Sequence, residues 1–154
     1  MNWSYKIAGI ELKEEDVPET AIGFIYIIRH KETRQKYLGK KLLTKAATKM
    51  VNGKKKKIRK PSSWQDYWSS SPLLLEMVEK EGKDKFDRII IGWAYSKATL
   101  IYMEESAQYQ LRVLESGVWL NGNIRSRIFK RNVYGKEEID TFSHDLFLYK
   151  DHCA

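Results

Sequence analysis

The segment that decides the fold of this chain reads GFIYIIRHKETRQKYLGKK and spans residues 23–41. Residues 24–28 are apolar and rich in β-branched and aromatic side chains, which favours a strand. Residues 30–35 are polar and are typical of a connecting turn, after which the extended pattern resumes. We therefore predict a β-hairpin that carries Tyr26 on its first strand and Tyr37 on its second.

Downstream of this hairpin, the sequence predicts two helices around a third strand. Ser71 and Pro72 form a good helix start, and that helix should run to about Lys80 and stop at Gly82. Residues 86–95 contain three consecutive isoleucines and favour a buried strand. A second helix is expected from residue 97 to about 114. The prediction is an α+β fold with a small three-stranded antiparallel sheet flanked by helices.

The chain divides into three expected segments. Residues 1–21 form an N-terminal arm with a short strand, 22–128 form one domain, and 129–154 form a C-terminal extension. The domain carries a basic insert at 40–61, where residues 40–50 have a possible helical face. Asn52-Gly53 then marks a turn, and a mobile lysine-rich loop follows it.

Composition narrows the class of protein. Of the 154 residues, 42% are hydrophobic, but no apolar run approaches the roughly 20 residues of a membrane span. The N-terminus lacks the apolar region of a secretory signal, and the single cysteine, Cys153, allows no internal disulfide. We expect a cytoplasmic protein. His144, His152 and Cys153 are too few and too poorly spaced for a zinc site.

Charge points to a polyanionic partner. The net charge is +8, and no acidic residue occurs between Glu32 and Asp66, a stretch rich in lysine. Such a block repels itself unless phosphates neutralise it, although a solvated loop is an open alternative. Aromatic residues of segment 64–71 either stack on bases or plug the edge of the core.

A carboxylate on the second helix is a further candidate. Glu104 borders the apolar face of that helix, so its head is partly desolvated and requires a nearby cation or donor. The alternative is an edge glutamate whose carboxylate reaches water.

Several short motifs follow the hairpin in a fixed order: 64-WQDYWSS-70, 82-GKDKFDR-88, 102-YMEESAQ-108 and 121-NGNI-124. Together with Tyr26 and Tyr37 they resemble the GIY-YIG nuclease family, most closely its phage-encoded, Seg-like homing-endonuclease branch. The similarity covers roughly residues 22–128.

The resemblance implies a metal-dependent DNA endonuclease that hydrolyses phosphodiester bonds. One divalent ion, Mg²⁺ or Mn²⁺, would be held by Glu104. Tyr26 would act on the attacking water and Tyr37 would support the same network. This mechanism requires both phenol hydroxyls to lie near Glu104, on one face of the sheet.

The resemblance also implies supporting residues. A cation from Lys40 or Lys41 would lower a phenol pKa, and Asn121 would close the site from its C-terminal side. Double-stranded DNA would be held by the candidate binding residues Lys45, Lys54, Lys55, Lys56, Lys57, Arg59, Lys60, Trp64, Arg125 and Arg127.

Two departures from the family pattern keep other functions open. The family commonly places an arginine on the helix after its second motif, but residues 40–50 contain none. Ser69 stands where the branch tends to have glycine. The alternatives are a catalytically weak or inactive nucleic-acid-binding module derived from a nuclease, and a phage protein that binds another protein through its aromatic patch.

Overall fold

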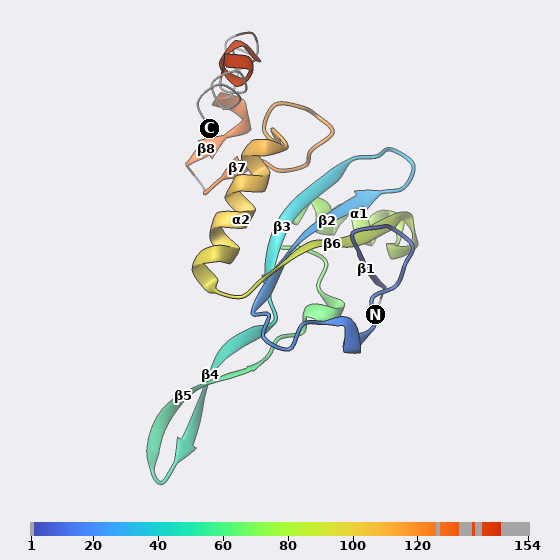
Figure 1. The fold of residues 1–154 in the computed structure, drawn as a ribbon. Helices are drawn as coiled ribbons and strands as arrows, with labels where there is room; N and C mark the ends of the chain where they lie inside the picture. Colours follow the sequence, from blue (N-terminus) through green and yellow to red (C-terminus); the bar gives the residue numbers. More distant parts are fainter. Residues whose placement is uncertain (1, 126, 133–136, 138–139, 146–154) are drawn as a thin grey trace.

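The computed structural model describes residues 2–125, 127–132, 137 and 140–145. Four strands form the central sheet, two longer helices flank it, and a separate two-stranded hairpin leaves it (Figure 1). The strands are β1 (Trp3–Tyr5), β2 (Gly23–His30), β3 (Lys36–Leu42), β4 (Thr44–Val51), β5 (Lys54–Pro61), β6 (Phe86–Ala94), β7 (Asn123–Ile124) and β8 (Ile128–Phe129). The helices are α1 (Pro72–Glu81) and α2 (Lys97–Gln110), with 3₁₀ turns η1 (Glu14–Asp16), η2 (Trp64–Asp66), η3 (Lys83–Lys85) and η4 (Lys130–Asn132).

The central sheet has the strand order β1-β6-β2-β3. Strand β2 is antiparallel to both β3 and β6, which matches the three predicted strands. The prediction of a wholly antiparallel, three-stranded sheet is nevertheless wrong, because β1 pairs with β6 in the parallel direction. The segment predicted as an N-terminal arm thus supplies an edge strand. Parallel strands are not joined by a tight turn, so no local sequence signal predicts that β1 pairs with β6.

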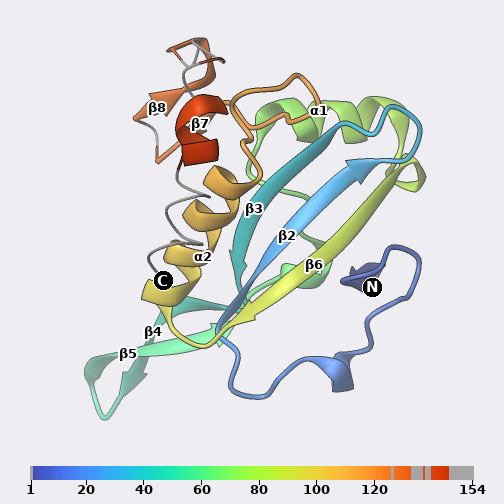
Figure 2. The ribbon, with the colours of Figure 1, turned by 45° about the horizontal axis from the view of Figure 1, so that its top comes forward.

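Each face of the sheet is covered by one helix (Figure 2). Helix α1 covers a core that includes Phe24, Tyr26 and Leu74. Helix α2 covers the opposite face, where Ile25 packs with Leu100. Because side chains alternate along a strand, neighbouring residues of β2 enter different cores. The alternation of the GFIY motif therefore builds both halves of the interior.

The two glycines of the hairpin are required by close approach. Tyr26 lies opposite Gly39 in the register, and a Cβ on Gly39 would lie 2.5 Å from the Tyr26 hydroxyl. A Cβ on Gly23 would lie 2.7 Å from Leu100 of helix α2. The missing side chain at Gly39 leaves room for the Tyr26 phenol on one face of β3. The missing side chain at Gly23 lets helix α2 approach the opposite face of the sheet at β2.

Local signals at the helix ends behave as predicted. Ser71 caps α1 by accepting a hydrogen bond from the Leu74 N–H at 3.3 Å, and Gly82 ends that helix with φ +97°. Ser96 caps α2 in the same way. Helix α2 ends earlier than expected, at Gln110, and Arg112 then adopts φ +53°, outside the helical region.

The basic insert differs most from its prediction. Residues 40–50 form no helix, because they end β3 and make β4, and the expected mobile loop is strand β5. The two strands pair from Thr44 opposite Pro61 to Val51 opposite Lys54. Asn52-Gly53 forms the predicted turn, with φ +50° and +76°. Both values suit a two-residue hairpin turn of type I′.

A segment near residue 120 lies along the free edge of β3. The Lys36 N–H donates to Val118 O, and the Leu120 N–H donates to Lys36 O, each at 2.8 Å. This pairing carries the chain from the end of α2 back to the sheet. Most of the expected extension 129–154 lies outside the described residues. Within the described part of the chain, no helix is long and apolar enough to cross a membrane.

The close approach at Gly39 gives a stability prediction. Gly39→Ala would place a methyl group against the Tyr26 phenol, so we expect the free energy of unfolding to fall by about 1–3 kcal/mol. Chemical denaturation measures this loss. Gly117→Ala is the matched control, because a Cβ there meets no atom within 4 Å. Equal stability of the two variants would contradict the packing described here.

Candidate active site

A solvent-open cleft of about 650 Å³ lies at the free edge of β3. Four parts of the chain meet there: strand β3, the start of helix α1, helix α2 and the segment after residue 119. The cleft is lined by Tyr37, Lys40, Ser70, Ser71, Pro72, Leu73, Glu104, Gln108, Leu120, Asn121, Gly122, Asn123 and Arg125. Four of the residues predicted as catalytic or metal-binding are therefore brought together: Tyr37, Lys40, Glu104 and Asn121.

Glu104 is held by a cation in this cleft. The Lys40 Nζ lies 3.0 Å from Glu104 Oε1, and the glutamate side chain is only 17% exposed. Alternation along β3 directs Lys40 towards helix α2, on the same face as Leu38. The expectation that a desolvated Glu104 needs a neighbouring cation is confirmed by this ion pair.

Tyr37 reaches the cleft from the other face of the sheet. It packs with the core beneath α1, whereas Glu104 comes from α2, so the two tyrosines and Glu104 do not share one face as predicted. They still meet because β3 is the edge strand, and side chains from both of its faces border the same opening. Burial raises the pKa of Tyr37, and the charge of Glu104 raises it further, while contact with the Ser70 hydroxyl opposes the shift.

Tyr26 lies behind Tyr37 and does not line the cleft. The two rings have their centroids 6.4 Å apart, and Tyr26 is 1% exposed. Burial raises its pKa far above the usual value near 10, and the neighbouring phenols of Tyr67 and Tyr37 add to the shift. The structure thus places Tyr26 behind the cleft, beside Tyr37, and its action on the attacking water stays a prediction.

Lys41 is also displaced from its predicted place. Its Nζ lies 4.3 Å from the centre of the Tyr67 ring, on the face of β3 opposite Lys40. Lys41 does not line the cleft, so the structure does not bring it together with Tyr37, Lys40 and Glu104.

Asn121 fixes the edge of the sheet. Its Oδ1 accepts the Leu38 N–H at 3.0 Å, and its Nδ2 donates to Leu38 O at 2.8 Å. Both amide groups are thus committed to the backbone of β3, and the side chain is 2% exposed. Asn121 closes the cleft from the C-terminal side, as the resemblance implied, but it does so as a positioning residue.

The sequence reasoning missed two serines beneath the tyrosines. Ser69 makes polar contacts with both phenols, and Ser70 contacts Tyr37 and lines the cleft. Ser69 has φ +113°, a conformation that favours glycine, which explains why a glycine suits this position. The departure from the family pattern keeps the backbone geometry and adds a buried hydroxyl. Both serines are present in the motif 64-WQDYWSS-70, but the sequence alone indicated only a change in the loop at Ser69.

Arg125 brings a guanidinium to the cleft. It pairs with Glu105 at 3.0 Å and remains 66% exposed, so part of its fork faces solvent. Arg127, two residues later, is exposed but does not line the cleft.

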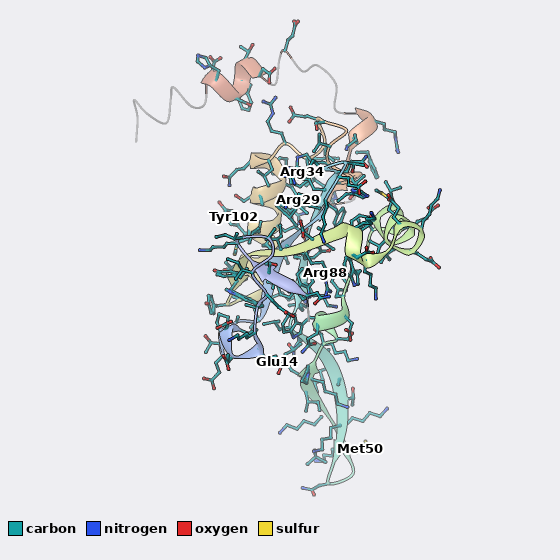
Figure 3. The ribbon with its side chains drawn as sticks, turned by 90° about the vertical axis from the view of Figure 1, so that its right-hand side faces the viewer. Glu14, Arg29, Arg34, Met50, Arg88 and Tyr102 are labelled. Carbon is teal, nitrogen blue, oxygen red and sulfur yellow. The ribbon has the colours of Figure 1, made fainter. Side chains whose placement is uncertain are left out.

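Trp64, the first aromatic residue of segment 64–71, lies in the core, whereas Tyr67 and Trp68 are half-buried. Trp64 is 6% exposed, and its ring lies 5.8 Å from that of Phe24 in the core. The prediction that Trp64 stacks on nucleic acid is therefore wrong, and the alternative that it plugs the edge of the core is right. Arg88, labelled in Figure 3, lies between the rings of Trp3 and Trp68 and donates to Tyr67 O at 2.9 Å. Burial lowers the pKa of Arg88 to about 10, and its role is structural.

The donor set suits a hard divalent ion that keeps most of its water. Among the described residues, no three His, Cys, Asp or Glu side chains are grouped to enclose a metal. Glu104 supplies one carboxylate. One helical turn away, the buried Oε1 of Gln108 has no hydrogen-bond partner among the described residues. Mg²⁺ is commonly held by one or two carboxylates, waters and substrate phosphates. The residues present therefore fit such an ion.

Comparison with known proteins agrees with this arrangement. The family model described as "Putative endonuclease segE, GIY-YIG domain" matches residues 3–124, which include every strand of the central sheet and the cleft up to Ile124. Searches of curated proteins and of solved structures gave no significant match. The match covers most of the chain, and it extends the resemblance seen in the hairpin and its following motifs. The chain therefore belongs to the Seg-like GIY-YIG family of endonuclease domains.

Proposed function

We propose that this protein is a metal-dependent endonuclease that cuts double-stranded DNA at the cleft beside β3. The observation that carries the proposal is the meeting of Tyr37, Lys40 and Glu104 in one open cleft of a GIY-YIG domain. Such a cleft can receive a phosphodiester from outside without a lid. A homing role stays a prediction from the resemblance.

Each residue has a role that follows from its surroundings. Glu104, with Gln108 beside it, would hold the divalent ion, which supplies Lewis-acid polarisation of the phosphoryl oxygen when bound. If a metal ion takes the place of the Lys40 ammonium beside Glu104, Lys40 can bind a phosphate oxygen instead. Tyr37 keeps its proton because its pKa is raised, so it donates a hydrogen bond and orients water or phosphate.

Arg125 offers a substitute for the family arginine that is absent from residues 40–50. The arginine of the family sits on a helix after the second motif, whereas this chain has strands there. A planar guanidinium that lines the cleft can grip two phosphate oxygens and offset charge in the transition state. Arg125 therefore supports the active endonuclease over the inactive binding module. The buried state of Trp64 takes one of its three aromatic residues from the patch on which the protein-binding alternative rested.

The decisive test is nicking of supercoiled plasmid with magnesium and with chelator. We expect magnesium-dependent cutting that Glu104→Gln lowers by roughly a hundredfold or more, because the amide keeps the shape but loses the charge that holds the ion. Glu76→Gln, an exposed change on α1, is the matched control. Unchanged cutting by Glu104→Gln would refute the mechanism, and salt-sensitive binding without cutting would support the inactive module.

The raised pKa of Tyr37 predicts how the rate depends on pH. The phenol stays protonated below about pH 10, so Tyr37→Phe should lower the nicking rate roughly tenfold or more by the same factor across pH 6 to 9. Tyr102→Phe, on the exposed surface of α2, should leave the rate unchanged. A rising limb present in the parent and absent from Tyr37→Phe would mean that the phenol ionises, against this prediction.

Arg125 can be tested against its neighbour. Arg125→Lys keeps the charge but removes the two-point grip, and we expect kcat to fall roughly tenfold. Arg127→Lys is the matched control from the same segment and should retain the parental kcat. Plasmid nicking under saturating magnesium measures both, and an equal effect of the two changes would remove Arg125 from the site.

A further inference from the structure

The hairpin of β4 and β5, residues 44–61, forms a ribbon that extends away from the rest of the domain. Figure 3 shows it leaving the body, with Met50 labelled near its far end. We call it the basic ribbon. Its strands remain paired along their whole length up to the Asn52-Gly53 turn. The ribbon is thus a regular structure with a defined shape, and its function can be argued from that shape.

The charge of the basic ribbon is not balanced by the protein. It has eight basic residues and no acidic one, and all eight are exposed. Lys45 lies directly opposite Lys60, and Lys49 lies opposite Lys56. Like charges at directly opposed positions destabilise a hairpin. No carboxylate of the described residues forms an ion pair with these cations. An external polyanion would relieve the repulsion.

The distribution of charge between the two faces indicates the form of that polyanion. Alternation in the register gives one face Lys45, Lys49, Lys54, Lys56 and Lys60, and the other face Lys55, Lys57 and Arg59. A flat anionic surface, such as a membrane, would be met by one face of the ribbon alone. A groove with phosphates along both walls would engage both faces together.

We propose that the basic ribbon enters the major groove of B-form DNA. That groove is about 12 Å wide and about 8.5 Å deep, and it admits a two-stranded β-ribbon. The minor groove is about 6 Å wide, too narrow for paired strands, and the major groove of A-form RNA is too deep and narrow to be read by side chains. The ribbon therefore selects duplex DNA by groove shape, beyond general attraction to phosphate.

The position of the ribbon relates groove binding to the cleft, and this step rests on the proposed function. The ribbon follows β3 almost directly, since only Leu43 separates the two strands. Twelve residues separate Lys40 from Asn52, which at roughly 3.3 Å per residue span at most about 40 Å. At about 3.4 Å per base pair, the groove contact should lie within roughly 12 base pairs of the bond that is cut.

Dimethyl sulfate footprinting in chelator tests the proposal without cutting. The reagent methylates guanine N7 in the major groove and adenine N3 in the minor groove, so protection identifies the groove. We expect the parent protein to protect guanine N7 on a duplex. A shortened ribbon, lacking residues 48–51 and 54–57, should lose this protection. Ala47 and Ile58 are cross-strand partners, so Asn52-Gly53 can join them with the register intact.

Charge substitutions provide a second variant that keeps the ribbon. Lys54→Gln with Lys55→Gln and Lys56→Gln should weaken duplex binding at least tenfold at about 150 mM salt, and the slope of log affinity against log salt should fall by about 2 to 3. The matched control replaces three exposed lysines elsewhere, Lys13, Lys80 and Lys97, by glutamine. It should bind nearly as the parent does.

The outcomes separate the ribbon from the cleft. Protection of adenine N3 with guanine N7 unprotected, equally tight binding of an RNA duplex, or an unaltered footprint with the shortened ribbon would each overturn the proposal. Guanine protection without nicking would support the ribbon and count against the proposed nuclease. Nicking without guanine protection would do the reverse.

Discussion

The amide of Asn121 bonded to both backbone groups of Leu38 is the interaction on which the cleft depends. An edge strand has unpaired N–H and C=O groups on its free side, and β3 is such a strand. The side-chain amide satisfies the two groups of Leu38 and anchors the returning chain at that edge. Together with the backbone bonds of Lys36 to Val118 and Leu120, it holds the segment that leads to Arg125 beside β3. One buried asparagine thus joins parts of the chain more than 80 residues apart.

The edge position of β3 also explains how Tyr37 and Glu104 meet although they lie on different faces of the sheet. In the middle of a sheet, residues on opposite faces are separated by the backbone of neighbouring strands. At an edge, the last strand is the only barrier, and Tyr37 and Glu104 border one opening. Burial raises the pKa of both phenols, and the charged side chains that line the opening are Lys40, Glu104 and Arg125.

Local signals in the sequence were sufficient for the hairpin, both helix caps and the Asn52-Gly53 turn. They failed where a pattern fits two structures: Leu42, Leu43, Ala46 and Ala47 have the spacing of a helical face, yet they lie in and beside strands. The turn that follows was the stronger evidence, since two residues of this type between extended segments are typical of a hairpin. A helix also could not explain why the lysine run continues beyond the turn.

Other features depend on register and long-range pairing, which the sequence does not contain locally. Whether Lys40 or Lys41 faces Glu104 is decided by the pairing of β2 with β3, in which Tyr26 lies opposite Gly39. The parallel pairing of β1, and with it the burial of Trp3 and Trp64, needs partners more than 60 residues away. The family resemblance identified the family from the order of its motifs, but it predicted neither this pairing nor the choice between the two lysines.

The junction between the sheet and the basic ribbon links DNA contact to chemistry. The Leu43 N–H donates to Ile22 O at 2.9 Å, and Leu43 O accepts from the Ser62 N–H at 2.8 Å. The Ser62 hydroxyl also donates to Leu42 O at 2.7 Å. The two ends of the ribbon are thereby tied to each other and to the sheet at its base. A ribbon fixed in this way has a set direction relative to Lys40, so binding in a groove would present the backbone to the cleft at a set distance.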